Sequence, residues 1–596
     1  MLSGWNDLPL EMLYLPVSFN CRIMPRNVCN ILNLTVLLHV SSLSNAFSIV
    51  EITPPPHSLT SARNTSVTIA FDSELNPASV SAGAIHVFGH WSGVAVGTYA
   101  LVEGNKRVRF TPSTLFNAGE WVCVTVSKSV QSLAGENLTY GYSWHFWIKP
   151  SPGTIELVEM DRISVREPGE GHIQTYGAHG GDLNHDGLSD FFVPNEISND
   201  CRVFMNDGTG RYSDFDIYPI QNGARPSTNE SADFNGDGHL DLAVGNSTGD
   251  SITVFLGDGT GSFLSIRNYK AASGIRGLAV ADMDGDGDID IVTANRTANN
   301  ITILQNLGDG SFGLRMILDA NSIGETACAT ADANGDGILD LFVGAHGSGE
   351  ISVLLGDGES GFMFSEKTDA GGDGTWMVAV GDLNGDGNVD VACVNSQSAN
   401  AGIIFGDGNG GLSSATAYPT GGFPIAIDLG DIDGDGDLDL MTSNYSGGNW
   451  AYWENDGTGA FINRRILDSE YAGSCATFHD RDNDGDLDMT GIDEEADLII
   501  MFENTGPSAT VDPVHSEELI VYPNPSHSGW IIDIQDNLCH YFQILDMQGH
   551  RIVRQKHMEH GGLFIPASTM NDGVYTLQLL DSDNRLISSH KIILMY

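Results

Sequence analysis

Aspartate and asparagine recur in this sequence at alternate positions of a nine-residue loop, D-x-[DN]-x-D-G-x-x-D. The loop occurs seven times between Asp182 and Asp488. Ca²⁺ requires oxygen ligands at alternate positions of a short loop and glycine at the sixth, where the chain must turn sharply. Positions 1, 3, 5 and 9 supply side-chain oxygens, and position 7 supplies its backbone carbonyl. The pattern therefore predicts up to seven structural calcium ions.

The loops that begin at Asp282, Asp431 and Asp480 offer four side-chain carboxylates, and the other four loops offer three. Because ligand charge tunes calcium affinity, we expect the first group to bind most tightly. Without metal the clustered carboxylates repel one another, so folding and calcium binding should be coupled. The predicted ligands, loop by loop, are Asp182, Asn184, Asp186, Leu188 and Asp190; Asp233, Asn235, Asp237, His239 and Asp241; Asp282, Asp284, Asp286, Asp288 and Asp290; Asp332, Asn334, Asp336, Ile338 and Asp340; Asp382, Asn384, Asp386, Asn388 and Asp390; Asp431, Asp433, Asp435, Asp437 and Asp439; Asp480, Asp482, Asp484, Asp486 and Asp488.

The EF-hand shares the first six positions of this loop, but it needs a bidentate glutamate at position twelve and flanking helices. Position twelve is occupied in the seven copies by Val193, Val244, Thr293, Val343, Cys393, Thr442 and Gly491. None of these side chains can replace glutamate, and the residues after each loop alternate or are β-branched, as in strands. The sequence therefore predicts that each loop joins two strands.

The loops start 49 to 51 residues apart. A period of this length predicts repeated supersecondary units that bury their apolar faces against one another. In several units a further apolar run ends in a glycine and aspartate turn, as in residues 251–263, which predicts a hairpin and a four-stranded unit. The loop combined with LGDGxGxF resembles the FG-GAP or VCBS repeat family, which builds the propeller of integrin alpha subunits and of many secreted bacterial proteins. The resemblance implies a seven-bladed β-propeller over residues 151–508.

The seventh unit has no fourth strand before the composition changes after Met501. Residues 154–165, which precede the first loop, match the fourth strands of the other units. We therefore expect this amino-terminal strand to complete the last blade and close the ring, which removes an exposed sheet edge.

Residues 47–150 contain short alternating segments that are typical of strands. Their order resembles the bacterial Ig-like domain of surface-layer and adhesin proteins, which implies a β-sandwich. Trp144, His145 and Trp147 lie on its last strand. They could form a ligand platform, but alternate aromatic residues in such a strand favour a core position.

Residues 509–596 combine a polar linker with short strands separated by Gly, Asn and Asp turns. The YPNP stretch 522–525, the D-x-x-G turn 546–549 and the DGVY strand 572–575 resemble the type A carboxy-terminal sorting domain of type IX secretion. The resemblance implies a small β-sandwich that the type IX secretion machinery recognises at the outer membrane. The ending KIILMY departs from the more usual lysine-terminated tail. The whole chain is thus predicted to be all-β.

Residues 1–46 have the pattern of a signal peptide. Arg26 precedes the apolar run 31–40, and Ser44-Asn45-Ala46 resembles a cleavage site. Met24 is a candidate for the true start, and a disordered amino terminus is the alternative. No other segment is a transmembrane candidate. The leader, the acidic loops suited to millimolar extracellular calcium and the terminal YPNP and DGVY strands together predict a secreted protein or one on the outer-membrane surface.

The chain has 78 acidic and 27 basic residues and a formal net charge of −51. This charge excludes electrostatic binding to nucleic acid. Outside the leader the six cysteines are scattered singly, without zinc or redox spacing, and Cys328 and Cys475 are expected to act as small buried hydrophobic residues.

Catalytic patterns are weak. Gly245 to Gly249 matches G-x-S-x-G, but the neighbouring units carry polar turns at the same place, whereas the nucleophile elbow needs a strand-to-helix turn. His185, His239 and His479 lie in or beside the acidic loops, where oxygen ligands suit calcium better than histidine does. No cluster of His, Arg or Tyr stands out, so we predict no catalytic residues.

Two classes of function follow from these observations. The first is a noncatalytic secreted binding or adhesion scaffold, whose face opposite the calcium loops contacts a glycan or a surface protein. The alternative is an extracellular polysaccharide-active enzyme, a lyase or hydrolase, or a lectin, built on a calcium-loaded propeller. Fold alone does not decide between them.

Overall fold

The computed structural model describes residues 46–504, except 209, 213–214 and 221–223, and the strands of the segment 520–594. The described residues form strands and two short 3₁₀ helices, η1 (Pro77–Ser79) and η2 (Tyr445–Gly447). The predicted leader up to residue 45, with Met24 in it, and the linker at 509–519 lie outside the described residues.

The amino-terminal domain is a sandwich of two four-stranded sheets. One sheet has the order β1 (Ile49–Thr53), β2 (Val67–Phe71), β6 (Arg107–Pro112), β5 (Gly97–Val102), and the other β4 (Gly93–Val94), β3 (Ile85–Gly89), β7 (Trp121–Val126), β8 (Tyr142–Trp147). Alternate residues of β6 are buried, as a half-buried strand requires. Trp144 lies in the core, and its Nε1 donates to the Pro54 carbonyl at 3.0 Å.

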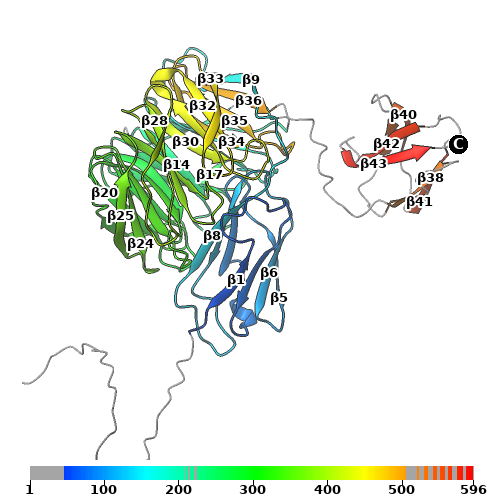
Figure 1. The fold of residues 1–596 in the computed structure, drawn as a ribbon, viewed down its shortest axis with the longest axis horizontal. Helices are drawn as coiled ribbons and strands as arrows, with labels where there is room; N and C mark the ends of the chain where they lie inside the picture. The colour runs from blue at the N-terminus through cyan, green and yellow to red at the C-terminus, as the bar shows by residue number, and fades with distance from the viewer. Residues whose placement is uncertain are drawn as a thin grey trace, which may run out of the picture. The chain divides into compact units, whose positions relative to one another are not determined.

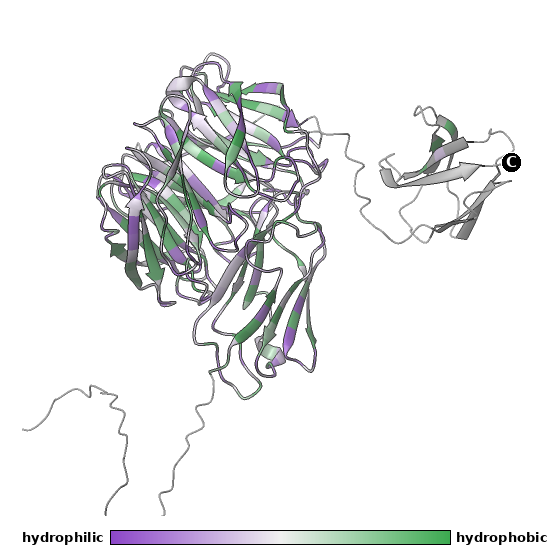
Figure 2. Ribbon diagram, in the orientation of Figure 1, coloured by the Kyte–Doolittle hydropathy of each residue, from purple (hydrophilic) through white to green (hydrophobic). Residues whose placement is uncertain are grey.

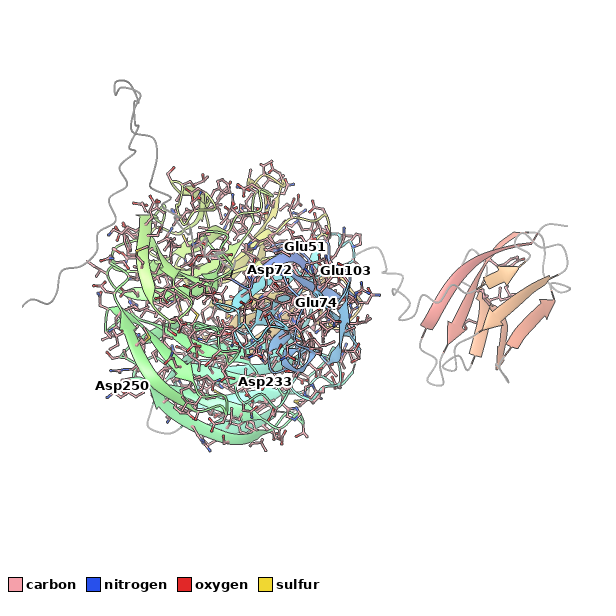
Figure 3. The ribbon with its side chains drawn as sticks, turned by 90° about the horizontal axis from the view of Figure 1, so that it is seen from below. Glu51, Asp72, Glu74, Glu103, Asp233 and Asp250 are labelled. Carbon is pink, nitrogen blue, oxygen red and sulfur yellow. The ribbon has the colours of Figure 1, made fainter. Side chains whose placement is uncertain are left out.

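Acidic side chains gather on the outer surface of this sandwich. Figure 3 shows Glu51, Asp72, Glu74 and Glu103 grouped on its ribbon. Arg107 pairs with two of them, at 2.7 Å to Glu51 and 3.2 Å to Glu103. This surface accounts for part of the negative net charge.

Seven four-stranded antiparallel sheets follow, one for each acidic loop, and together they form a β-propeller. We call each sheet a blade. The first six blades are β10 (His179–Gly181), β11 (Asp190–Asn195), β12 (Asp200–Phe204), β13 (Phe215–Pro219); β14 (Pro226–Ala232), β15 (Asp241–Asn246), β16 (Ser251–Gly257), β17 (Phe263–Lys270); β18 (Ile275–Ala281), β19 (Asp290–Asn295), β20 (Asn300–Asn306), β21 (Phe312–Leu318); β22 (Glu325–Ala331), β23 (Asp340–Ala345), β24 (Glu350–Gly356), β25 (Phe362–Asp369); β26 (Thr375–Gly381), β27 (Asp390–Asn395), β28 (Asn400–Ile404), β29 (Thr416–Pro419); β30 (Pro424–Gly430), β31 (Asp439–Asn444), β32 (Asn449–Asn455), β33 (Phe461–Asp468).

The seventh blade joins strands from the two ends of the propeller sequence. It consists of β34 (Gly473–His479), β35 (Asp488–Asp493), β36 (Leu498–Asn504) and β9 (Leu157–Ser164). In Figure 1 the cyan β9 lies beside the orange β36, and Ile163 pairs with Ile499. The predicted closing strand is therefore present. Ser474 Oγ donates to the Tyr176 carbonyl at 2.8 Å, which ties the seventh blade to the first.

Packing between blades explains the burial pattern. All six residues of the second strand are buried in every blade, because blades cover both faces of this strand. The fourth strands, such as β33, expose most of their residues. Figure 2 shows hydrophobic residues along the blade strands.

The carboxy-terminal segment forms two further sheets. They are β37 (Ile520–Tyr522), β38 (Gly529–Ile534), β41 (Gly561–Pro566), and β40 (Arg551–Lys556), β39 (Tyr541–Leu545), β42 (Gly573–Leu580), β43 (Leu586–Leu594). Tyr522 ends β37 and Tyr575 lies in β42, whereas the rest of YPNP, the turn 546–549 and Asp572 lie outside the described residues.

Candidate functional site: metal loops and channel rim

The seven acidic loops, called metal loops below, each connect the first strand of a blade to the second. In the third blade β18 ends at Ala281 and β19 begins at Asp290, so strands flank the loop, as the exclusion of the EF-hand predicts. The sixth-position glycine has a positive φ in all seven loops, for example 100° at Gly287. Residues with a Cβ adopt this conformation at a cost, which explains the glycine.

Carboxylate oxygens converge in the three loops that have four carboxylates. Their ligand atoms lie within 4.8 Å of one another in three groups: Asp282, Asp284 and Asp290; Asp431, Asp433 and Asp439; Asp480, Asp482 and Asp484. Some buried oxygens in these loops have no hydrogen-bond partner among the described residues, including Oδ1 of Asp431, Asp437 and Asp486. Unpartnered carboxylate oxygens are costly unless a cation binds them, so this donor set fits Ca²⁺.

In the loops with three carboxylates, backbone amides hold the predicted ligands in place. Asp182 accepts from the amides of Asp186 at 3.0 Å and Gly187 at 2.9 Å. Position five in turn accepts from position seven, as Leu188 donates to Asp186 Oδ1 at 2.9 Å. Asp190 accepts from Leu183 at 3.1 Å. These bonds hold the loop in a tight turn around the Asp182 carboxylate.

Burial and neighbouring carboxylates raise the pKa of several metal-loop residues. The pKa of Asp282 is raised to about 7, mainly by burial and secondly by the neighbouring Asp286 carboxylate. Burial raises the pKa of Asp439 to about 9. Without metal the folded protein therefore holds protons that the unfolded chain releases, and its stability falls as pH rises from about 4 towards these values. Calcium needs the deprotonated carboxylates.

We therefore expect the stabilisation by calcium to be small at pH 5 and large at pH 8. The melting temperature with excess calcium minus that with chelator, measured at both pH values, tests this. An equal difference at the two pH values would contradict it.

The seventh metal loop carries a cation of its own. Its second position holds Arg481, where the other loops have an apolar residue, and this side chain is fully buried. The guanidinium hydrogen-bonds Glu503, lies 3.6 Å from Asp488 Oδ2 and donates to the Gly210 carbonyl at 2.6 Å. Because Arg481 offsets part of the ligand charge, we expect calcium to bind this loop less tightly than the loops at Asp282 and Asp431.

Arg481→Leu gives the seventh loop the apolar residue of the others. In chelator we expect a loss of about 3 to 5 kcal/mol in the free energy of unfolding, because Asp488 and Glu503 lose their buried partner. In excess calcium the loss should be smaller, since the metal replaces the missing cation. Urea unfolding under both conditions measures this, with Arg162→Leu, which breaks a surface ion pair, as the control. Equal losses would argue against a calcium site there.

The amino-terminal sandwich packs on the metal loops. The Lys128 amide donates to the Gly285 carbonyl at 2.8 Å, and the Ser143 amide to Gly337 at 3.0 Å. The sandwich residue Trp91 accepts from the Asp182 amide at 2.8 Å. These bonds reach the first, third and fourth metal loops, so the sandwich covers this face of the propeller.

Trp147 belongs to this interface. It packs with Leu383 and Leu438, which flank ligands of the fifth and sixth metal loops. His145 is partly buried, and burial lowers its pKa to about 3. Trp144 therefore occupies the core position that the sequence favours, whereas His145 and Trp147 line a cavity of the propeller.

A cavity of about 400 Å³ occupies the channel between the first strands of the blades. Sandwich residues such as His90 and Trp121 line it together with Asp282 and Gly287 at the metal-loop end. Inside the channel, burial raises the pKa of Glu230 to about 8. The sandwich therefore leaves the opposite face as the free face of the channel.

The opposite face is identified by strand register. In the third blade Ala281 pairs with Asp290 beside the metal loop, and Ile275 pairs with Asn295 at the other end. Residues next to that second pair surround the channel mouth. We call these the channel rim: Tyr176 just before β10, Arg276 in β18 and Trp376 in β26, and Glu196, Arg296, His346 and Glu494 in the turns after second strands.

Aromatic rings and guanidinium groups meet at the channel rim. Trp376 Nε1 donates to the Tyr176 hydroxyl at 3.3 Å. The Arg296 guanidinium carbon lies 5.0 Å from the Trp376 ring centroid, and that of Arg276 lies 5.5 Å from the Tyr176 ring. Arg276 Nη1 is 3.0 Å from Glu196 Oε1. The structure thus places an arginine and aromatic cluster where the sequence had suggested none.

The sequence does contain a signal for this cluster. Tyr176, Arg276 and Trp376 follow one another at intervals of 100 residues. They therefore occupy the same position in three different fifty-residue units. Comparing equivalent positions across the units would have brought them together.

The remaining candidates have structural roles. His185 Nε2 lies 2.8 Å from His239 Nδ1, which joins the first two metal loops. His479 is buried, its Nε2 lies 2.8 Å from Thr490 Oγ1, and burial lowers its pKa to about 3. Gly245 lies near the end of β15, and the turn after it leads into β16. This is a hairpin turn and not the strand-to-helix turn that a nucleophile elbow requires.

The described cysteines form no disulfide. Cys123, Cys201, Cys328, Cys393 and Cys475 are free thiols, and burial raises the pKa of each of them. Cys328 is buried as expected and Cys475 is half-buried, and both line the channel cavity.

Several solved structures are similar to this chain over most of their own length. They include an Agrocybe aegerita lectin, described as recognising non-reducing terminal N-acetylglucosamine, at 16% identity, with 67% of this chain and 94% of that chain covered and a TM-score of 0.37. A protein of unknown function from Desulfotomaculum acetoxidans has 11% identity, coverage of 62% and 96%, and a TM-score of 0.36. A Chaetomium thermophilum Polycomb Repressive Complex 2 structure has 7% identity, coverage of 59% and 98%, and a TM-score of 0.42.

Sequence families match all three regions of the chain, although no curated protein matches it. Residues 44–147 match the bacterial Ig-like domain, and residues 520–595 match the secretion system C-terminal sorting domain. The sorting domain indicates type IX secretion to the extracellular or outer-membrane surface. None of the helices in the described part of the chain is long and apolar enough to span a membrane.

FG-GAP-like repeats match at 182–244, 233–293, 282–343, 332–393, 382–442 and 431–489. These overlapping matches cover every metal loop and more than half of the 596 residues. The chain therefore belongs to the FG-GAP-like repeat family, as a secreted or cell-surface member with an Ig-like domain and a type IX sorting domain.

Proposed function

We propose that this protein is a noncatalytic binding or adhesion scaffold, in which calcium in the metal loops stabilises the propeller. The ligand, a glycan or a surface protein, binds at the channel rim. The metal loops hold the blades and support the sandwich, so their role is structural.

The main support for this proposal is that the two faces of the propeller have different surroundings. The sandwich contacts the metal-loop face through Lys128, Ser143 and Trp91, whereas Trp376 and Tyr176 line the channel mouth on the other. Aromatic and arginine side chains around a concave opening are typical of binding sites. A ligand therefore finds its strongest anchoring groups on the rim.

A glycan-array and surface-protein screen of the secreted, calcium-loaded protein tests this proposal. We expect Trp376→Ala to weaken the binding of the best ligand about tenfold or more, as loss of a central aromatic anchor does. Leu264→Ala, which truncates an exposed side chain on the outer strand β17, is the control. Equal binding by the Trp376 variant and the wild type would exclude the rim as the site.

The channel supports a second candidate, an enzyme acting on polysaccharides. Burial raises the pKa of Glu230 to about 8 and that of Asp428 to about 6, and both line the cavity. A protonated carboxylic acid beside a carboxylate is the pair that glycoside hydrolysis uses. Release of reducing sugar by the wild type but not by Glu230→Gln would favour this function over the scaffold.

A further inference from the structure

The channel rim contains an arginine that pairs with no carboxylate among the described residues. Arg296 Nη2 lies 3.1 Å from His346 Nδ1, and its guanidinium stacks on Trp376. The rim carboxylate Glu196 is engaged by Arg276 at 3.0 Å. In a chain with 78 acidic and only 27 basic residues, such an arginine offers a local site for an anion.

Three blades place side chains on the rim through an unfavourable backbone conformation. The residue before each first strand is glycine with a positive φ in the third, fourth and fifth blades, for example 79° at Gly274. The equivalent repeat position, eight residues before the first aspartate of each loop, holds Gln174 at φ 58°, Arg225 at 51° and Phe423 at 54°. Bulky residues rarely adopt this conformation, and where they do the strain commonly accompanies a functional role.

These side chains bring varied chemistry to the rim. Phe423 is 37% exposed, and its ring centroid lies 5.8 Å from that of Trp376. Gln174 Nε2 donates to Glu494 Oε1 at 2.9 Å. An exposed ring can bury the apolar C–H face of a sugar. Amide and carboxyl groups can bind its hydroxyls.

The planar fork of Arg296 matches a carboxylate in a bidentate manner. The channel behind the rim is concave and therefore suits the end of a chain better than a flat protein surface. Building on the binding function proposed above, we propose that the channel rim binds the terminal uronic acid of an acidic polysaccharide, with the carboxylate on Arg296 and the sugar ring against Phe423.

Calorimetry with the secreted protein and a trimer of galacturonic acid, at one fixed calcium concentration, tests this inference. The methyl ester of the same trimer keeps the sugar but removes the charge. We expect the trimer to bind and its ester to bind about tenfold more weakly or worse, a difference of about 1.4 kcal/mol. Equal binding of the two, or no binding of the trimer, would overturn the inference.

Variants locate the carboxylate. Arg296→Gln should weaken trimer binding about tenfold or more, and Arg296→Lys, which keeps the charge but loses the fork, should have an intermediate effect. Arg464→Gln is a matched control, because this arginine also lies over a tryptophan, 5.4 Å from the Trp453 ring, but on the outer strand β33. Unchanged affinity in Arg296→Gln would refute the assignment.

Phe423→Gly separates binding from stability. Glycine adopts a positive φ without strain, so the melting temperature should not fall by more than a few degrees. Trimer binding should weaken, because the aromatic ring is removed. A trimer of glutamate serves as the protein-like probe, and equal affinity for it would show that the site recognises carboxylates without the sugar. If the uronate fails in any of these ways while another ligand still depends on Trp376, the proposed binding function stands and only its ligand class is wrong.

Discussion

Removal of calcium by a chelator is expected to lower the melting temperature of the secreted protein by more than about 10 °C. A site bound at 100 times its Kd stabilises the native state by about 2.7 kcal/mol, and seven loops contribute together. The decrease in melting temperature should be large because, without a cation, Asp282 would lie among the other carboxylates of its own loop, and so would Asp439. Calorimetry with chelator and with excess calcium measures the shift.

Single-loop variants show which sites carry this stabilisation. Asp284→Asn in the third loop and Asp433→Asn in the sixth should each remove more of the calcium-dependent shift than Asp482→Asn in the seventh, where Arg481 already supplies a positive charge. Asp250→Asn, outside the metal loops, is the control. Superimposed melting curves with chelator and with calcium would refute the calcium proposal altogether.

The sequence predicts best what is local and periodic. The metal loop is defined by nine consecutive residues, so its flanking strands and its positive-φ glycine follow from the pattern alone. The strand at Leu157–Ser164 was predictable for a related reason, because seven loops with six complete units leave one strand missing and only one matching segment supplies it.

The channel rim depends on distances that no local pattern encodes. Tyr176 and Trp376 are 200 residues apart in sequence and meet because the ring brings the first and fifth blades to one channel. The contact between the sandwich and the propeller also cannot be predicted from local sequence, because its hydrogen bonds involve backbone groups such as the Gly285 carbonyl. The sequence shows that Arg481 replaces the apolar residue found at the second position of the other loops. Its burial beside Asp488, however, becomes apparent only in the folded structure.

The ring also separates folding from export, which makes the sorting domain testable by itself. The last propeller strand, β36, ends at Asn504 and pairs with β9, so every blade is complete before the carboxy-terminal segment begins. A chain that ends at Pro507 therefore keeps its propeller and sandwich. Its calcium-dependent melting temperature should match that of the full chain.

The same truncated chain is expected to accumulate inside the cell envelope, with a loss of about tenfold or more at the surface and in the medium, because residues 520–595 carry the type IX sorting signal. Immunoblots of cell-envelope, surface and medium fractions measure the distribution. Trp376→Ala in the full chain controls for ligand binding and should be exported normally, since the rim has no part in sorting. If the truncated chain folds and still reaches the surface as efficiently as the full chain, residues 520–595 do not direct its export. If it fails to fold, the argument that the seventh blade is closed by Asn504 is wrong instead, and the melting temperature distinguishes the two results.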